Sequence, residues 1–563
     1  MKKLFTILLC LAALMNTSVA KEKSDKDKKD WGYLTGSLES TNHFYVEDVA
    51  NSFFPSAQVQ LKGDNIYATN NYLKLDYNKG RLSAGMQMEG YFPTLVGYPI
   101  PTNKLSLSNI YATWRDRSWS VTAGTFYEQF GSGLLFRSWE DRTLGLNNAM
   151  LGARANYNFN DIVSVKAFWG IPRLGKKQVF MTGLDDNDPF FGLGLSKVNV
   201  AGVDVSFSLS NLLEMDAISL SVEGSVLNKH EAVSDALAVL GYKPNNIGWS
   251  GRVNFDYDGF YARGEYVDAG KQIVALGVKP EKGNAQLLEL GYNHRGLGVS
   301  VTGRRMDRMV QRIYGYTATD PGYGTTANML SYRPAMSTQY TYMLTTLNPY
   351  APEIGDKMIK AGEIGGQIDA FYNFRRGTVL GGKRGMKMHA NFSTYYALNE
   401  NGGTKGGGLL FRDFSFDVEK QWTKEFKMVL LYSAQEYNKH NENTGVYIGL
   451  SHIVVADLLY KWTPKLSSRL ELQYLATKDD QGDWMAGLLE VNLAPHWSVF
   501  GSDMWNHGGS KLHYYNAGVS WSMSNIRLAA GYGRYKAGFI CSGGVCREIP
   551  AYTGANLSLN ISF

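Results

Sequence analysis

Residues 123–154, AGTFYEQFGSGLLFRSWEDRTLGLNNAMLGAR, begin and end with the alternation of apolar and polar side chains that is typical of a β-strand. Between these ends the alternation breaks at several glycines. The interruption mixes large aromatic residues with four charged ones, Arg137, Glu140, Asp141 and Arg142. Unpaired charges are costly in a low-dielectric environment. We therefore predict that the interruption folds inward and pairs its charges; the alternative is a surface loop with weak local ion pairs.

Alternating segments recur along the rest of the chain. Examples are residues 72–77, 82–89, 218–223, 249–257, 386–393 and 556–563. Aromatic residues gather near the ends of such segments, as at Tyr395, Tyr396 and Trp505. Alternation with aromatic girdles is typical of transmembrane β-strands, whose side chains face lipid and lumen in turn.

Short and long connections alternate between these segments. Polar turns are expected at 78–81, 115–118, 158–161, 256–259, 293–296, 422–425, 463–466, 494–497 and 522–525. Longer excursions are expected at 47–64, 91–104, 128–148, 170–197, 228–248, 269–283, 305–365, 397–412, 437–446, 475–483, 506–513 and 535–551. This asymmetry is typical of outer-membrane barrels, and a sandwich or propeller gives no reason for it. We predict an all-β chain that forms a single large transmembrane antiparallel β-barrel of about 24 strands (an even number, roughly 18–26) with inward-folded loops.

The beginning of the chain has the pattern of a signal peptide. Lys2 and Lys3 precede an apolar run over 4–14, and Ser18-Val19-Ala20 is a small-residue cleavage site. Residues 1–20 are therefore expected to direct export, residues 21–30 (KEKSDKDKKD) to form a charged disordered lead-in, and residues 31–563 to form the barrel. The expected location is the outer membrane of a bacterium, with the lipid bilayer as the surroundings of the barrel.

Composition narrows the function classes. Tyr numbers 35 and Gly 61, and a net charge of +6 is too small a basic excess to indicate a nucleic-acid partner. No run of about 18 apolar residues follows the signal segment, so no transmembrane helix is expected. A soluble secreted β-protein is the weaker alternative to a barrel.

The sequence contains no catalytic constellation. GxSxG and HExxH are absent, and we expect neither an enzyme nor a cofactor. His507 and His513 share one expected loop near Asp503, but two histidines on a solvated loop rarely bind a metal. Cys541 and Cys546 are predicted to form a disulfide in the oxidising compartment, with two free thiols as the alternative.

A barrel of this strand number encloses a space too wide for wall side chains to fill, so it is either an aqueous pore or a barrel filled by loops. The segments 128–148 and 305–365 are long and charged enough to fill it. We predict that the lumen or its constriction is lined by Glu128, Arg137, Glu140, Asp141, Arg142, Arg154, Arg304 and Arg305. The loop charges are expected to pair with inward-facing wall residues, namely Lys74, Asp76, Glu89, Arg154, Glu223, Arg252, Arg263, Glu265, Arg469 and Glu471. Such charges either select solutes or hold a plug in place.

The stretch FYEQFGSGLLFRSWEDRTLGLNNAMLGAR resembles a family of outer-membrane proteins from Bacteroidota that is catalogued only as a domain of unknown function. The family pattern is FYEQFGSGL, an Arg–aromatic–Glu–Glu–Arg run, LG and an Asn-Ala pair before GxR. Asp141 replaces the second Glu and Asn147 an Asp, and both changes keep the polarity. Residues 70–99 are also similar to the family's first strands. The resemblance implies an outer-membrane barrel and supplies no activity.

Two functions remain open at this point. The first is a porin-like channel or transporter with a charged, loop-constricted lumen. The second is a non-conducting structural or assembly barrel that binds a surface lipoprotein or another complex partner, since Tyr-rich external loops suit protein contacts. The terminal Phe563 resembles the signal that the barrel-assembly machinery reads, which adds that machinery as a partner in either case.

Overall fold

The structure is a computed structural model. It describes residues 31–563 apart from 62, 64, 102–103, 174–175, 178–192, 234, 273–278, 310, 312, 314–329, 336, 339, 347–361, 400–407, 442–444, 479–480 and 544. The expected signal peptide and lead-in, residues 1–30, lie outside the described part. Within that part, no helix is both long and apolar enough to cross a bilayer.

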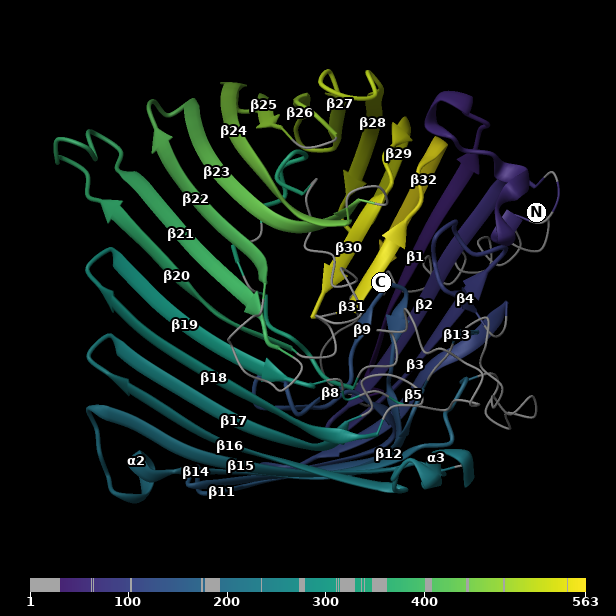
Figure 1. Cartoon of the computed structure of the whole chain (residues 1–563), viewed down its shortest axis with the longest axis vertical. Helices are drawn as coiled ribbons and strands as arrows, with labels where there is room; N and C mark the ends of the chain where they lie inside the picture. The colour runs from purple at the N-terminus through teal and green to yellow at the C-terminus, as the bar shows by residue number, and fades with distance from the viewer. Residues whose placement is uncertain are drawn as a thin grey trace, which may run out of the picture.

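One antiparallel sheet of 24 strands closes on itself, as predicted (Figure 1). Neighbouring strands follow chain order, and β1 pairs with both β2 and β32, which closes the barrel. The strands are β1 (Tyr33–Tyr45), β2 (Tyr67–Lys79), β3 (Leu82–Tyr91), β5 (Leu105–Arg115), β6 (Trp119–Phe126), β11 (Met150–Phe159), β12 (Val163–Pro172), β14 (Asn199–Ser208), β15 (Ile218–His230), β16 (Asn245–Tyr257), β17 (Phe260–Gln272), β18 (Glu281–His294), β19 (Leu297–Asp307), β20 (Gly362–Phe374), β21 (Met386–Ala397), β22 (Leu409–Gln421), β23 (Phe426–Asn441), β24 (Gly445–Thr463), β25 (Leu466–Thr477), β26 (Trp484–Leu493), β27 (Trp497–Trp505), β28 (His513–Met523), β29 (Ile526–Tyr535) and β32 (Tyr552–Ser562).

The alternation in the sequence separates the two faces of the wall. On β16, Trp249 and Val253 are 46% and 47% exposed on the outer face. Ser250 and Arg252, which alternate with them, face the interior and are buried. An apolar outer face and a polar inner face are what a bilayer demands of a closed barrel. The chain is therefore a transmembrane β-barrel.

The connections alternate between a short-turn side and a long-loop side, and both ends of the described chain lie on the short-turn side. The Gly36 N–H donates to the Phe563 carbonyl over 2.7 Å, next to the start of β1. Two short-side connections escaped the sequence analysis: 209–217, which contains helix α2 (Leu209–Leu212), and 375–385. The excursion predicted at 437–446 is mostly strand, because β23 and β24 continue to Asn441 and from Gly445.

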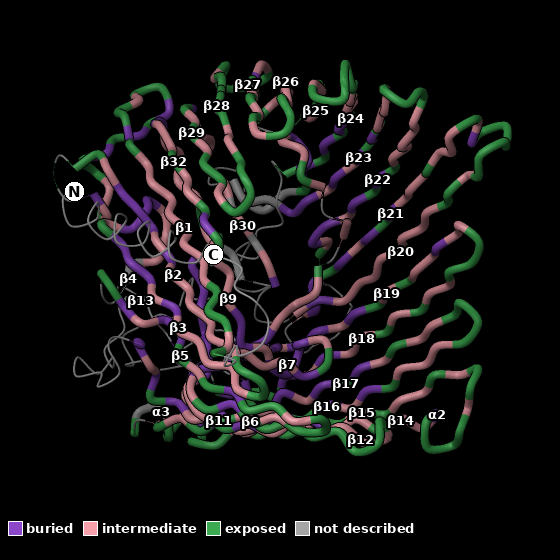
Figure 2. Tube along the Cα trace, turned by 180° about the vertical axis from the view of Figure 1, so that it is seen from behind, coloured by how far each residue is buried: buried purple, intermediate pink, exposed green. Residues whose placement is uncertain are grey.

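Short elements occupy the long loops. Four two-stranded sheets pair β4 (Ile100–Pro101) with β13 (Lys176–Lys177), β7 (Gln129–Phe130) with β8 (Phe136–Arg137), β9 (Glu140–Asp141) with β10 (Leu146–Asn147), and β30 (Gly538–Ser542) with β31 (Val545–Ile549). Helix α3 (Asp235–Val239) and three 3₁₀ turns, at Val49–Asn51, Pro55–Ala57 and Val59–Leu61, complete the described elements. In both views, β9 and β30 lie within the ring of wall strands (Figures 1 and 2).

Candidate functional site: loops that cross the lumen

Residues 127–149, the interruption within 123–154, form an arch between β6 and β11 that contains the hairpins β7–β8 and β9–β10. Its first hairpin buries Phe130, Leu135 and Phe136 completely in a cluster with Phe168 and Val267, which belong to the wall strands β12 and β17. Burial of large apolar side chains stabilises each by about 1.5–3 kcal/mol. The arch is therefore packed on the inner wall rather than extended into solvent.

Gly131 brings the backbone of the arch against the wall. Its φ is +52°, and an added Cβ would lie 2.5 Å from the Cδ of Arg252 on β16. The neighbouring Ser132 N–H donates to a carboxylate oxygen of Glu265 over 3.2 Å. A glycine is required here, because any side chain would displace the arch from β16 and β17.

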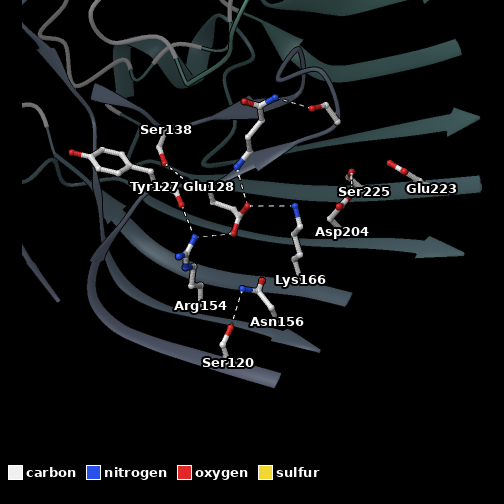
Figure 3. Close-up of polar contacts among 12 residues, drawn as sticks. Ser120, Tyr127, Glu128, Ser138, Arg154, Asn156, Lys166, Asp204, Glu223 and Ser225 are labelled. Carbon is white, nitrogen blue, oxygen red and sulfur yellow. Dashed lines mark hydrogen bonds and ion pairs between the residues drawn. The ribbon is translucent and has the colours of Figure 1, made fainter. Parts of the chain in front are cut away.

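Glu128 anchors the start of the arch to basic residues of the wall (Figure 3). Its carboxylate lies 3.5 Å from the Arg154 guanidinium of β11 and 3.8 Å from the Lys166 ammonium of β12. The Glu128 N–H donates to the Ser138 hydroxyl over 3.0 Å, and Arg154 also donates to the Tyr127 carbonyl over 2.8 Å. The structure thus brings together two residues that the sequence placed at the constriction, Glu128 and Arg154.

The wall beside Glu128 carries charges on successive strands, which can be followed in Figure 3. Lys166 is the register partner of Asp204 on β14. Asp204 accepts hydrogen bonds from Ser225 over 2.6 Å and from Arg252. Arg252 also pairs with Glu223 over 2.7 Å. Arg252 thus pairs with both Asp204 and Glu223 on the inner wall, while Lys166 pairs with Glu128 of the arch.

The later part of the arch, around β9 and β10, contacts a different arc of the wall, formed by β1, β2 and β3. Arg142 pairs with Glu39 of β1 over 2.6 Å and donates to the Gln87 side chain of β3 over 3.1 Å. The Gln87 amide in turn donates to Glu140 over 2.7 Å. The Arg142 guanidinium also stacks over the ring of Tyr72 on β2, 4.6 Å from its centroid. The arch therefore spans the interior from β16–β17 to β1–β3.

Two charged residues of the arch have other partners than the sequence analysis predicted. The Arg137 guanidinium lies 4.0 Å from the ring centroid of Tyr332 and 4.9 Å from that of Trp139. Asp141 accepts the backbone N–H groups of Thr143 and Leu144, so it closes a local turn. Partners within the loops, rather than carboxylates or cations of the wall, satisfy these two charges.

Residues 330–346, of which 336 and 339 lie outside the described part, form a second inward segment within the predicted loop 305–365. It begins on the arch, where the Tyr332 N–H donates to the Gly133 carbonyl over 2.8 Å. It ends on β23–β26, where Leu344 is completely buried among Leu431, Leu475 and Trp484. The rest of the predicted loop after Met309 lies largely outside the described residues.

Hydroxyl groups attach this segment to acidic residues of the wall. Tyr340 donates to Asp417 of β22 over 2.7 Å, and Tyr342 donates to Asp457 of β24 over 3.3 Å. His389 of β21 contacts Asp417 over 2.8 Å with one ring nitrogen and Asp369 of β20 over 2.7 Å with the other. Burial, together with hydrogen bonding to Asp417, raises the pKa of the Tyr340 hydroxyl, so it stays a donor at neutral pH.

The hairpin β30–β31 is a third inward element, and no sequence pattern predicts its inward fold. Arg547 donates to the Thr143 carbonyl of the arch over 2.9 Å and lies 3.9 Å from the ring centroid of Tyr98. The register sets Cys541 directly opposite Cys546. The side chains of both cysteines lie outside the described part, so the disulfide stays a prediction.

Arg304 and Arg305 separate to the two faces of β19. Arg304 faces inward and pairs with Glu363 of β20 over 2.7 Å, with both side chains buried. Arg305 points to the same face of β19 as Val301, which is 44% exposed on the outer face of the wall. Arg305 pairs with Asp307 over 3.1 Å near the long-loop end. Placing Arg305 in the lumen was wrong, because consecutive residues of a strand face opposite ways.

Two further ion pairs attach long loops to the wall. Arg173, which follows β12, is fully buried against Glu89, an inward-facing residue of β3. Asp48 accepts hydrogen bonds from Arg534 over 2.7 Å and from the Thr553 hydroxyl over 2.7 Å. Burial alone would raise the pKa of Asp48, but the hydrogen bonds from Arg534, Thr553 and the Asn51 N–H outweigh it and lower that pKa.

The histidines near the long-loop end do not gather into a larger cluster. His513 lies 2.6 Å from Asp503 and stacks on Trp505. In the described part of the chain, no group of three or more His, Cys, Asp or Glu side chains is arranged to hold a metal ion.

Fold and interior together define a large transmembrane β-barrel with loops folded into its lumen. The chain belongs to the family of unknown function DUF6029, whose sequence model matches residues 1–563. Among curated proteins, none matches this chain in sequence.

Several solved barrels are similar to this chain. The siderophore receptor PirA of Pseudomonas aeruginosa is 9% identical, with a TM-score of 0.40 over 97% of this chain and 82% of that one. A mutant of the ferric enterobactin receptor PfeA from the same organism is 10% identical, with a TM-score of 0.42 over 94% and 81%. OccK5 (OpdH), also from that organism, is 13% identical, with a TM-score of 0.35 over 76% and 98%.

Proposed function

We propose that the protein is a porin-like channel or transporter of the bacterial outer membrane, in which inward-folded loops constrict a charged lumen. The observation that carries the proposal is the attachment of one arch to two separate arcs of the wall, through Ser132 on Glu265 and Arg142 on Glu39. An arch that crosses the lumen divides its cross-section, so the arch limits the size of the solutes that pass.

The chemistry of the arch supports selection of solutes as well as obstruction. Arg142 and Glu39 keep 24% and 43% of their side-chain surface exposed, so their charges face water as well as each other. Arg154 is likewise partly exposed beside Glu128. Paired charges of opposite sign at a narrow passage create a transverse field that favours some solutes over others.

The surroundings of the barrel follow from its outer face and its ends. An apolar outer belt supports a place in a lipid bilayer, with the short turns in the periplasm and the long loops outside the cell. The last residue of the chain as given, Phe563, pairs beside β1 and supports recognition by the barrel-assembly machinery. The match of residues 126–154 to the motif of a Bacteroidota family supports that origin.

The test is conductance of the purified barrel in planar lipid bilayers, with and without the arch. Phe126 and Met150 are direct register partners, so a two-residue Asn-Gly turn can replace residues 127–149 and close the hairpin. We expect steady openings from the natural chain and larger openings from the shortened one. A silent natural chain together with a conducting shortened chain would contradict the proposal and favour the non-conducting assembly barrel.

A further inference from the structure

The inner wall differs from one arc to another in how far the loops cover it. On β22 and β23, the inward-facing Ser415 and Ser433 are each 1% exposed. On β28 and β32, the inward-facing Ser520 and Ser558 are partly exposed. Residue type is the same in both arcs, so the difference reflects the second inward segment, which contacts β20–β26 and whose apolar cluster ends on Met504 of β27 and Tyr514 of β28. Figure 2 shows this contrast along the trace.

We call the inner faces of β27, β28, β29 and β32 the polar arc. The register of the strands places its inward-facing residues side by side: Ser502 lies opposite Asn516, and Gly531 lies opposite Asn556. All residues of these four strands belong to the described part, and Arg527, near the short-turn end, is the single inward-facing charged side chain among them. The border of the arc is the contact between Arg142 of the arch and Glu39 of β1.

The side chains of the polar arc are small, neutral and capable of both donating and accepting hydrogen bonds. A serine hydroxyl and an asparagine amide each offer donors and acceptors. Asn556 donates to the Tyr535 hydroxyl over 2.6 Å, and that hydroxyl donates to Asn516 over 3.1 Å, so these groups hold one another in place. Inward-facing Phe500 adds aromatic surface to the arc, and Tyr514 stacks on Trp484 at its edge.

This chemistry matches solutes that carry hydroxyl groups and no net charge. An ion that leaves bulk water for a neutral wall loses solvation without gaining a counter-charge. A saccharide exchanges hydrogen bonds with water for hydrogen bonds with Ser and Asn and presents apolar ring faces to aromatic side chains. Resting on the proposed channel function, we propose that the passage runs along the polar arc and serves uncharged, hydroxyl-bearing solutes of the saccharide class.

The first experiment locates the passage by blocking it. Ser558→Cys places a thiol at mid-height in the polar arc, and Ser433→Cys places one at mid-height under the second inward segment. Polymer mass and glucose influx are measured for each variant in liposomes before and after treatment with a polyethylene-glycol maleimide. The natural chain is measured in the same way, as the control for reaction at Cys541 and Cys546. We expect Ser558→Cys to gain the polymer mass and lose most of its glucose influx, and Ser433→Cys to stay unmodified.

The second experiment addresses the solute class by liposome swelling in glucose, in the anion gluconate and in the cation glucosamine. We expect glucose to enter several times faster than either charged analogue, although all three are of similar size. Full modification of Ser558→Cys with unchanged influx would overturn the location of the passage. Equal rates for the three solutes would overturn the solute class. Absence of any flux through the natural chain would instead overturn the channel function itself.

Discussion

The contact between Arg142 and β1 makes a quantitative prediction about gating. Arg142→Ala removes an ion pair to Glu39, a hydrogen bond to Gln87 and a stacking contact on Tyr72. Partly exposed ion pairs contribute about 0.2–1 kcal/mol, and an exposed cation–π contact about 0.5–1 kcal/mol. The sum of about 1–2 kcal/mol corresponds to a factor of roughly 5–30 in the equilibrium between attached and detached arch. The packed end of the arch near Phe130 is unaffected, so only one end is released.

The assay is single-channel recording at low and at high salt. We expect Arg142→Ala to raise the time spent in a large-conductance state by roughly the factor of 5–30 given above. High salt should move the natural chain toward the variant, because it screens partly exposed charges. The matched control is Arg263→Ala, which removes an exposed inward guanidinium paired with Asp256 on the wall alone. Unchanged gating in Arg142→Ala, or the same change in both variants, would refute the attachment of the arch to β1.

Three further predictions concern the other loop attachments. Arg173→Ala leaves the buried Glu89 without its cation and is expected to cost about 3–5 kcal/mol, seen as unfolding at lower temperature or denaturant in heat-modifiability gels. The pKa of Asp48 is lowered below its ordinary value of 3.8, so its pairing with Arg534 contributes stability that is fully present above pH 3.8. This stability is lost as the pH falls through the lowered pKa of Asp48 in the folded chain. Protease cleavage of the loop between β1 and β2 should therefore rise in that pH range in the natural chain and be pH-independent in Asp48→Asn. Tyr340→Phe removes one hydroxyl anchor of the second inward segment, and hydrogen exchange over 338–346 should accelerate by roughly fivefold, as expected for about 1 kcal/mol.

The barrel itself could be predicted from the sequence because a bilayer imposes a period of two on every strand. Residues 249–257 illustrate this, since each predicted face is the face observed. The connection 375–385 was missed because it is longer than the tight turns that mark the short-turn side. The same period of two contains the information that separates Arg304 from Arg305, although the pair looks like one basic cluster when read along the chain.

The interior could be predicted only in part. The density of charges in 128–148 predicts an inward segment. Glu128 and Arg154 lie close together because Glu128 follows β6 and Arg154 belongs to its paired strand β11. Glu39 and Tyr332 carry no local signal, because their roles depend on which residue the arch meets after crossing the barrel. Contacts between loops that are distant in sequence depend on three-dimensional packing, so the spacing of residues in the sequence does not predict them.

The direct pairing of Phe126 with Met150 restricts how the arch moves. Both ends of the arch are fixed side by side on β6 and β11, so the segment behaves as a tethered flap rather than a removable stopper. A separate plug domain can be pulled out whole by a partner. A flap hinged at one site on the rim swings through a limited angle, and its own length bounds the widest aperture that it leaves.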